Sequence, residues 1–297
     1  MKKIVTLYDV SNITKLSEYA DGFIVANDMF ATRVEKSFSK SDIITAIKTC
    51  HDLGKMIFVS INKMLHNDHI EPLKSFINAL EAYDPTGYIV GDIGVVHIFN
   101  TLKIPNKVIY NPETLLTNKF DFNFNATLGL FGAFLAKEIP LEDVLEITKE
   151  KELSVFMYVH GYLNMFYSKR QLINSYFQNS DKPNDYHEKR NLKIREEQRP
   201  DLRYPILEDS GGTHVFRENV FTTLNQIDDI STNIDYGIFD MVLHDDDYAY
   251  DVLKRYTEIM KGQIENEFDD LEIKYDEQWD EGFLFKKTVY KPKKVTR

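Results

Sequence analysis

The sequence has almost no cysteine: Cys50 is the only one among 297 residues. A single thiol excludes a disulfide framework, a four-cysteine zinc site and an iron–sulfur cluster held by cysteines of this chain. Cys50 lies within an expected helix, beside Ile47 and Leu53. We therefore expect a buried apolar side chain there rather than a nucleophile.

Positive charge and long apolar stretches are also scarce. The 36 Lys and Arg residues against 47 Asp and Glu give a net charge of −11, which argues against a strongly basic nucleic-acid-binding protein but leaves room for a local basic patch. No apolar run approaches the roughly 20 residues that span a bilayer. The apolar start Ile4–Tyr8 ends at Asp9, too early for a secretory signal. We expect a cytoplasmic protein without a membrane partner.

The common catalytic motifs are missing as well. The sequence contains no His-Glu-x-x-His, no Gly-x-Ser-x-Gly, no Gly-x-x-x-x-Gly-Lys-Ser/Thr and no Gly-x-Gly-x-x-Gly. These absences remove the familiar zinc-peptidase, serine-hydrolase, phosphate-loop and dinucleotide-binding signatures. His244 followed by Asp245–Asp247 is better explained as charge at the start of a helix than as a cation site.

What is present is a regular alternation of strand-like and helix-like segments. Short β-branched or aromatic runs predict strands at Ile4–Leu7, Phe23–Ala26, Met56–Ile61, Tyr88–Val90, Lys107–Tyr110, Thr127–Phe131 and Val155–Val159. Apolar residues at helical spacing predict helices at Asp42–Leu53 (capped by Ser41), Glu71–Tyr83, Val95–Leu102, Leu141–Glu150 and Tyr248–Met260. This repeat predicts an α/β fold of the TIM-type (β/α)8 barrel class, with a doubly wound open sheet as the alternative.

The alternation stops after Tyr176. Gln178–Pro205 is polar and charged without a strand-like run, and Lys169–Arg203 holds nine Lys and Arg against six Asp and Glu. We expect a long charged insertion after the seventh strand, a feature that is often functional. Strand-like runs return in three places, Tyr204–Leu207, His214–Phe216 and Ile238–Leu243.

The predicted organisation is a barrel over residues 1–260, including the insertion 178–205, and a short C-terminal tail over 261–297. Lys261–Gly282 holds nine acidic residues, whereas Lys286–Arg297 holds six basic and no acidic ones. Phe283–Phe285 and Thr288–Tyr290 alternate like a strand. The tail is either a solvated end or a strand folded back beside the insertion.

Active sites of (β/α)8 barrels lie at the carboxyl ends of the strands. Polar residues follow most of the expected strands there: Asn27-Asp28, Asn62-Lys63, Asp92, Asn111 with Thr114, Lys137-Glu138, His160, and Asp240 or His244. They predict a polar pocket of mixed charge, with Asp92 and Asn111 as substrate-binding candidates. Each residue alone is better explained as a loop cap or a solvated charge, and only the set as a whole favours a site.

Two clusters add further candidates. The run Tyr158–Arg170 leaves a strand through His160-Gly161, where glycine permits a turn or a close backbone approach, and reaches Tyr167, Lys169 and Arg170, which suit a carboxylate or phosphate. The run Tyr204–His214 carries Glu208, Asp209 and His214 around two glycines. We take Tyr167, Lys169 and Arg170 as substrate-binding candidates and His160, Glu208, Asp209 and His214 as catalytic candidates. A plain strand end and a β-turn are the structural alternatives.

In this order, the two clusters resemble the U32 peptidase family of collagenase-like proteases. The family signature is Glu-x-Phe-x-x-Gly-Ser/Ala-aliphatic-Cys. Set on Phe156–Asn164, it matches Gly161 and Leu163, and Tyr167-Ser168-x-Arg170 looks like the family's Tyr-Ser-Gly-Arg-Cys. The resemblance covers essentially the whole chain and implies a barrel.

The positions that depart from the signature indicate which branch of the family the chain resembles. Asn164 and Gln171 replace the two cysteines, Phe156 replaces the glutamate and Lys169 the glycine. The chain is therefore most similar to the cysteine-poor, YrrN-type branch of the family. That likeness implies prephenate-dependent 5-hydroxylation of the tRNA wobble uridine, no iron–sulfur cluster, a cysteine-containing paralogue as partner and tRNA contact through a local basic patch. Prephenate would suit Lys169 and Arg170.

Two other functions stay open. The family name implies a collagenase-like peptidase (a hydrolase), although no metal set and no activated Ser or Cys is readable in the sequence. The lost cysteines favour a non-catalytic scaffold subunit, which stabilises the paralogue, over an independent redox enzyme.

Overall fold

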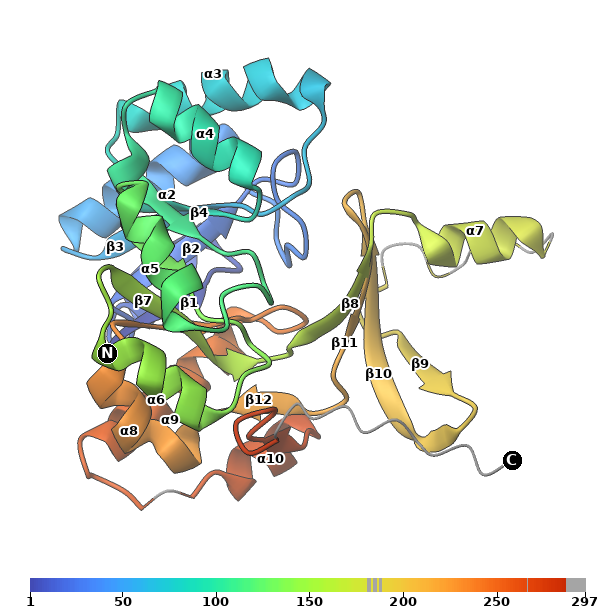
Figure 1. Cartoon of the computed structure of the whole chain (residues 1–297). Coiled ribbons are helices and arrows are strands. Elements are labelled where there is room, and N and C mark those ends of the chain that lie inside the picture. Colours follow the sequence, from blue (N-terminus) through green and yellow to red (C-terminus); the bar gives the residue numbers. More distant parts are fainter. Residues whose placement is uncertain (181–182, 184–185, 187–188, 266, 287–297) are drawn as a thin grey trace, which may run out of the picture.

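The computed structural model describes residues 1–180, 183, 186, 189–265 and 267–286. Its main part is a closed barrel of parallel strands with helices around it (Figure 1). The barrel strands are β1 (Lys2–Thr6), β2 (Gly22–Ala26), β3 (Met56–Ile61), β4 (Gly87–Val90), β5 (Val108–Tyr110), β6 (Gly132–Phe134), β7 (Ser154–Gly161) and β13 (Tyr236–Phe239). Each pairs in parallel with the next, and β13 closes the ring between β7 and β1. The TIM-type expectation is confirmed.

The barrel closes around one layer of apolar side chains. Each of the eight strands contributes one buried residue to this layer: Ile4, Ile24, Phe58, Ile89, Ile109, Phe134, Phe156 and Ile238. A second, larger apolar cluster lies between the strands and the helices. Because strand side chains alternate between the two faces, the same short apolar runs supply both cores.

The helices that cover the barrel include the five that were expected and three that were not. They are α1 (Ile13–Leu16), α2 (Lys40–Asp52), α3 (Ile70–Glu81), α4 (Ile93–Thr101), α5 (Lys119–Thr127), α6 (Leu141–Lys149), α8 (Ile227–Asn233) and α9 (Asp246–Met260), with 3-10 turns at Val10–Asn12, Asn67–His69, Pro105–Lys107 and Leu224–Gln226. The expected helices are α2, α3, α4, α6 and α9, and the unexpected ones are α1, α5 and α8. The cap of α2 is Ser39, two residues before the expected Ser41, because Ser39 and Asp42 form a reciprocal capping box. Within the described residues, no helix is long and apolar enough to span a membrane.

The insertion between β7 and β13 forms a second sheet that projects from the barrel (Figure 1). Its antiparallel strands are β8 (Asn164–Ser168), β11 (Gly212–Phe216), β10 (Arg199–Asp209) and β9 (Lys193–Glu196), in that order, with α7 (Leu172–Asn179) after β8. We call these four strands the projecting sheet. The expectation of no strand in Gln178–Pro205 is wrong, because β9 and the start of β10 form a hairpin there. Both of those segments are exposed, so no apolar alternation marks them.

Two other expected strands are also wrong. Thr127 ends α5, and the strand is β6 at Gly132–Phe134, because Asn118 caps a helix whose apolar pattern is weak. Phe283–Phe285 lies in a turn, and Thr288–Tyr290 is outside the described residues. The tail instead contributes α10 (Asp269–Tyr275) and β14 (Trp279–Asp280), which pairs in parallel with β12 (Val220–Thr222) beside β7.

Candidate functional site

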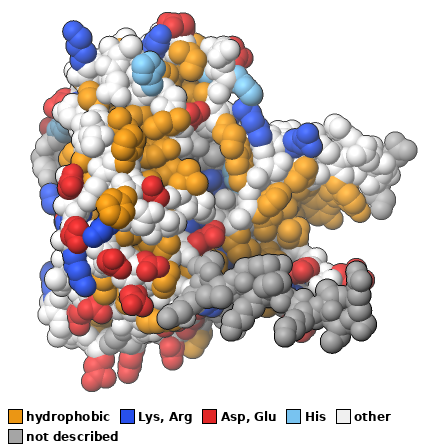
Figure 2. All heavy atoms as spheres, viewed as in Figure 1, with side chains coloured by type: hydrophobic (Ala, Val, Ile, Leu, Met, Phe, Trp, Pro, Cys, Tyr) orange, Lys and Arg blue, Asp and Glu red, His pale blue; other side chains and the backbone are white. Residues whose placement is uncertain are grey.

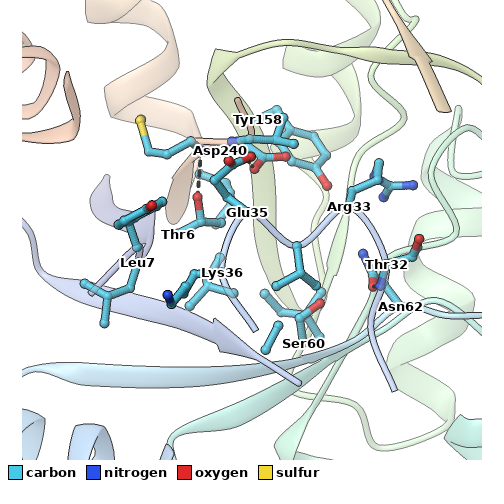
Figure 3. Close-up of a pocket in the computed structure, with 18 of the residues that line it drawn as sticks. Thr6, Leu7, Thr32, Arg33, Glu35, Lys36, Ser60, Asn62, Tyr158 and Asp240 are labelled. Atoms are coloured by element: carbon cyan, nitrogen blue, oxygen red, sulfur yellow. Dashed lines mark hydrogen bonds between the residues drawn. The ribbon is translucent and has the colours of Figure 1, made fainter. Parts of the chain in front are cut away.

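The alternation of strand side chains builds a polar chamber directly above the apolar layer of the barrel. The mouth of the barrel lies at the carboxyl ends of its strands. On six of the strands, the residue two positions after the apolar layer lies at this mouth: Thr6, Ala26, Ser60, Asn111, Tyr158 and Asp240. Because side chains two apart on a strand share a face, these residues point to the same interior as the layer below. We call this space the inner chamber; Figure 3 shows it. It encloses about 710 Å³, open solvent at its mouth included.

A charged cluster stands at the edge of the chamber. The Glu113 carboxylate accepts from the Arg33 guanidinium and from Lys137 Nζ, the latter at 2.5 Å. The Arg33 and Lys137 side chains are only 10% and 5% exposed. Burial alone would raise the pKa of Glu113, but the two neighbouring cations outweigh it and hold the pKa at about 2. Two buried cations therefore share a single carboxylate partner.

Asp240 is the group in the chamber best suited to exchanging a proton. Burial raises its pKa to about 6, against the opposing effect of the Arg33 charge. Tyr158 lies beside it (Figure 3) and has its own pKa raised by burial. Asn111 Nδ2 donates to the Tyr158 hydroxyl at 3.0 Å. A carboxyl that titrates near neutral pH can act as acid or base.

The backbone at this mouth holds three non-glycine residues in the left-handed region. Arg33 has φ +57°, Glu113 φ +66° and Leu243 φ +69°. Such conformations persist only where the surroundings enforce them, and they gather at functional sites. The charged cluster is thus held in place by strained loops and not by helix or strand geometry.

A second space opens between the barrel mouth and the projecting sheet. The barrel side of this space is lined by Lys63, Met64, Asp92, Thr114 and Glu138 from loops and by Ile93, the first residue of α4. The other side is lined by Asn164, Met165 and Tyr167 from β8, and residues of the inner chamber and the charged cluster complete the lining. We call this space the outer cleft. It shares Thr32, Arg33, Asn62 and Asn111 with the inner chamber, so the two spaces adjoin at Arg33.

The structure brings Asp209 and His214 together, but their contacts hold the backbone and side chain of the Thr32–Arg33 loop. We call this set of contacts the Asp209 clamp. The Asp209 carboxylate accepts from Arg33 N at 2.8 Å, from Thr32 Oγ1 at 3.0 and 3.1 Å, and from Gly211 N at 2.7 Å. His214 Nε2 lies 2.9 Å from Thr32 Oγ1, and the Tyr167 ring stacks on His214 at 4.8 Å. The turn of the β10–β11 hairpin thereby fixes the Thr32–Arg33 loop.

The Thr32, His214 and Asp209 side chains do not form a nucleophilic triad. The threonine hydroxyl donates to Asp209, so its proton is not offered to the imidazole. Asp209 approaches the same nitrogen, Nε2, at 3.6 Å, and His214 Nδ1 has no partner among the described residues. Thr32 is 4% and His214 0% exposed, which closes them to a peptide. Burial raises the pKa of Asp209, but the hydrogen bonds it accepts lower it to about 2, so it is a poor proton carrier.

His160 lies away from both spaces. The pairing of β7 with β13 shifts register next to His160, and this shift turns the His160 side chain out of the barrel interior. Outside the barrel, His160 Nε2 lies 2.8 Å from the Tyr248 hydroxyl of α9. Burial lowers the pKa of His160 to about 3. Tyr248 and His244 both bond Glu277 of the tail, so His160 belongs to a buried polar cluster that joins the tail to the barrel.

The other sequence candidates lie around the outer cleft or in caps. Glu208 accepts from Ile173 N and Asn174 N at the start of α7, and Asp92 caps α4 through Gly94 N. Lys169 Nζ donates to Met64 O at 3.0 Å beside the cleft, and Arg170 is exposed next to it. Among the described residues, no group of three His, Cys, Asp or Glu side chains could hold a metal ion.

Sequence reasoning missed Arg33 and Glu113. Both lie in loops after strands, where no apolar pattern marks them. The one usable signal was the length of the connection between β2 and α2, residues 27–39, since long loops at barrel mouths often carry function.

Comparison with known proteins gives the lineage. The family model of Peptidase family U32 matches residues 11–289. The chain is 30% identical to tRNA hydroxylation protein P2 of Bacillus subtilis, over 98% of this chain and 100% of that protein. It is 27% identical to tRNA hydroxylation protein P of Escherichia coli over 54% of this chain, but that match spans only 36% of the relative.

Two further similarities are narrower. The 23S rRNA 5-hydroxycytidine C2501 synthase of Escherichia coli is 27% identical over 50% of this chain and 22% of its own length. The solved U32 peptidase Mk0906 has a TM-score of 0.47 and 13% identity over 55% of this chain and 70% of that one. With the family model matching nearly its whole length, the chain belongs to the U32 peptidase family.

Proposed function

We propose that this protein takes part in the 5-hydroxylation of the wobble uridine of tRNA and that the barrel mouth is its working site. The full-length similarity to a tRNA hydroxylation protein supports the reaction class. The observation that carries the site is the pair of buried cations, Arg33 and Lys137, sharing Glu113 between the inner chamber and the outer cleft.

In this proposal the inner chamber takes a small organic acid such as prephenate. Arg33 and Lys36 line this chamber, and Lys137 lines a small pocket that adjoins it at Arg33 and Asp240. A carboxylate would meet these cations in place of Lys169 and Arg170, which lie at the outer edge. A guanidinium binds a carboxylate through two parallel hydrogen bonds, and the low exposure of Arg33 and Lys137 strengthens the attraction. The apolar floor formed by Ile24, Ile89 and Phe134 suits a carbon ring.

The proposal includes a partner. Cys50, the only thiol, is buried in α2, so this chain offers no cysteine ligands for an iron–sulfur cluster. We propose that a cysteine-containing paralogue supplies that part of the reaction. A tagged chain that retains no such paralogue from its own cell extract would remove this part while leaving the site proposal standing.

The test is nucleoside mass spectrometry of total tRNA from a strain that lacks the gene and any redundant hydroxylation pathway. We expect the 5-hydroxyuridine derivatives to disappear and to return when the wild-type gene is supplied. An unchanged nucleoside profile on deletion would refute the proposal.

Peptidase activity is the rival function. A peptidase would need a nucleophile or an activated water beside an open cleft. Thr32 borders both spaces, but it is only 4% exposed, its hydroxyl donates to Asp209, and His214 is fully buried. Purified protein should therefore leave labelled gelatin intact. Cleavage of gelatin that is lost in His214→Ala but kept in Lys149→Ala would instead favour the peptidase.

A further inference from the structure

We propose that the outer cleft holds one unpaired nucleotide of an RNA loop, with its phosphate at the Lys63, Lys169 and Arg170 edge and its base against the apolar side chains of the cleft. This inference rests on the proposed function and adds to it the place where the RNA binds.

The cleft has two walls that come from different parts of the fold. Met64 belongs to a loop at the barrel mouth and Ile93 is the first residue of α4, whereas Asn164, Met165 and Tyr167 belong to β8 of the projecting sheet. The space between them, open solvent included, is about 1090 Å³. An unpaired base can enter such a gap, whereas a base within a duplex cannot.

The cations at this edge form no ion pair with a carboxylate of the described residues. Lys63 Nζ donates to Asp28 O at 2.8 Å and to Ser210 Oγ at 3.0 Å. Lys169 Nζ donates to a backbone carbonyl, and Arg170 follows it. Among the residues that the structure describes, none of these three cations has a carboxylate partner. In a chain of net charge −11, such a local excess of positive charge suits a phosphate.

Figure 2 shows the distribution on one face of the molecule. Blue Lys and Arg side chains lie between the upper barrel and the projecting sheet, and red Asp and Glu side chains are most numerous on the lower part of the barrel. A polyanion would therefore be drawn to the upper part and repelled lower down.

Apolar side chains are exposed around the same cleft. Met64 is 51%, Ile93 56% and Met165 41% exposed. Exposed apolar side chains beside a polar cleft gain when the flat face of a base covers them, and stacking or apolar contact of this kind tolerates any base. Asp92 and Glu138 also line the cleft, and a carboxylate there can accept from a base N–H group.

The position of the cleft relative to the inner chamber completes the argument. The two spaces share Arg33, Asn62 and Asn111. A base in the cleft would therefore lie next to an organic acid in the chamber, so that both reactants meet at Arg33.

The experiment measures binding of a fluorescein-labelled anticodon stem–loop RNA with an unmodified wobble uridine by fluorescence anisotropy, over a range of salt concentrations. The test variant is Lys169→Ala/Arg170→Ala. The charge-matched control is Lys149→Ala/Lys254→Ala, whose lysines are exposed or half-exposed on α6 and α9, away from the cleft. We expect the dissociation constant of the test variant to rise about tenfold, and the slope of its logarithm against log salt to fall by about one to two. Ile93→Asn should weaken binding without changing that slope.

Wild-type binding that the test variant leaves unchanged would overturn the inference, and so would the absence of any binding to the stem–loop. Equal binding of a duplex of the same sequence, or displacement of the RNA by a gelatin peptide, would also overturn it. The tRNA nucleoside profile separates the two proposals. If deletion removes 5-hydroxyuridine but the cleft variants bind RNA normally, the function stands and the cleft assignment fails; if the profile is unchanged but RNA binding depends on the cleft, the reverse holds.

Discussion

At the scale of single residues, the carboxyl groups around the barrel mouth have pKa values shifted in opposite directions. Asp209 and Glu113 are held ionised by donors and cations, with pKa values near 2, whereas Asp240 has a pKa near 6. Environments that push carboxyl pKa values apart are typical of sites where one group positions and another exchanges protons.

The Asp209 clamp makes a stability prediction. Its folded-state pKa of about 2 lies below the unfolded value of about 3.9. Its contribution is therefore fully present above pH 4 and is lost as the pH falls towards 2. We expect Asp209→Asn to lower the free energy of unfolding by about 1 to 3 kcal/mol at pH 7, with a smaller difference from wild type at pH 3. Urea denaturation at both pH values measures this.

The exposed Asp52 on α2 provides the control, and Asp52→Asn should stay within about 0.5 kcal/mol of wild type. An Asp209→Asn protein as stable as wild type at pH 7 would mean that the clamp does not hold the Arg33 loop.

Asp240 should act in the opposite direction. The folded-state pKa of Asp240, about 6, lies above the unfolded value. Between pH 4 and 6 the folded state therefore binds more protons than the unfolded state, and the free energy of unfolding falls as the pH rises through this interval. Asp240→Asn should remove up to about 3 kcal/mol of this fall. Thermal unfolding across pH 4 to 7 tests it, and parallel pH profiles for variant and wild type would show that Asp240 titrates normally.

At the scale of elements, the backbone crossing from β7 into the insertion depends on Gly161. It has φ +125°, and a Cβ atom there would lie 2.1 Å from Asp240 O. The sequence indicated this position, since a glycine directly after a strand-end histidine permits a close backbone approach.

We expect Gly161→Ala to lower the free energy of unfolding by about 3 kcal/mol or more, because both the dihedral and the contact are unfavourable. Gly262→Ala is the matched control, since Gly262 has φ +63° and nothing within 4 Å of the added Cβ, and it should cost only about 1 kcal/mol. Chemical denaturation compares the two. Similar losses in both variants would show that the contact with Asp240 O is not restrictive.

The helices and strands that could be predicted from the sequence are those with one buried face, because a buried face requires apolar residues at regular spacing along the sequence. Seven of the barrel strands and five of the helices have apolar residues at fixed spacing, and β6 was displaced only because the sequence of α5 mixes Phe with Asn. The hairpin of β9 and β10 could not be predicted, since exposed strands have no such period. The strand ends identified the mouth residues Asn62, Asp92, Asn111 and Lys137, but Arg33 and Glu113 depend on loop conformations that only tertiary contacts fix.

At the scale of the whole molecule, the barrel and the projecting sheet form one site between them. Asp209 of the projecting sheet holds the backbone of Arg33, whose side chain reaches Glu113 of a barrel loop. The insertion therefore does more than extend the surface, since it sets the conformation of the residue where the inner chamber and outer cleft meet.

The most direct test of this account is the amount of 5-hydroxyuridine derivatives in tRNA from a deletion strain that expresses Arg33→Ala, compared with the same strain expressing Lys149→Ala at an equal protein level. The account predicts at least a tenfold loss for Arg33→Ala, because the chamber loses a buried cation that its anionic ligand needs, and no change for Lys149→Ala. Full hydroxylation with a stably expressed Arg33→Ala protein would contradict it.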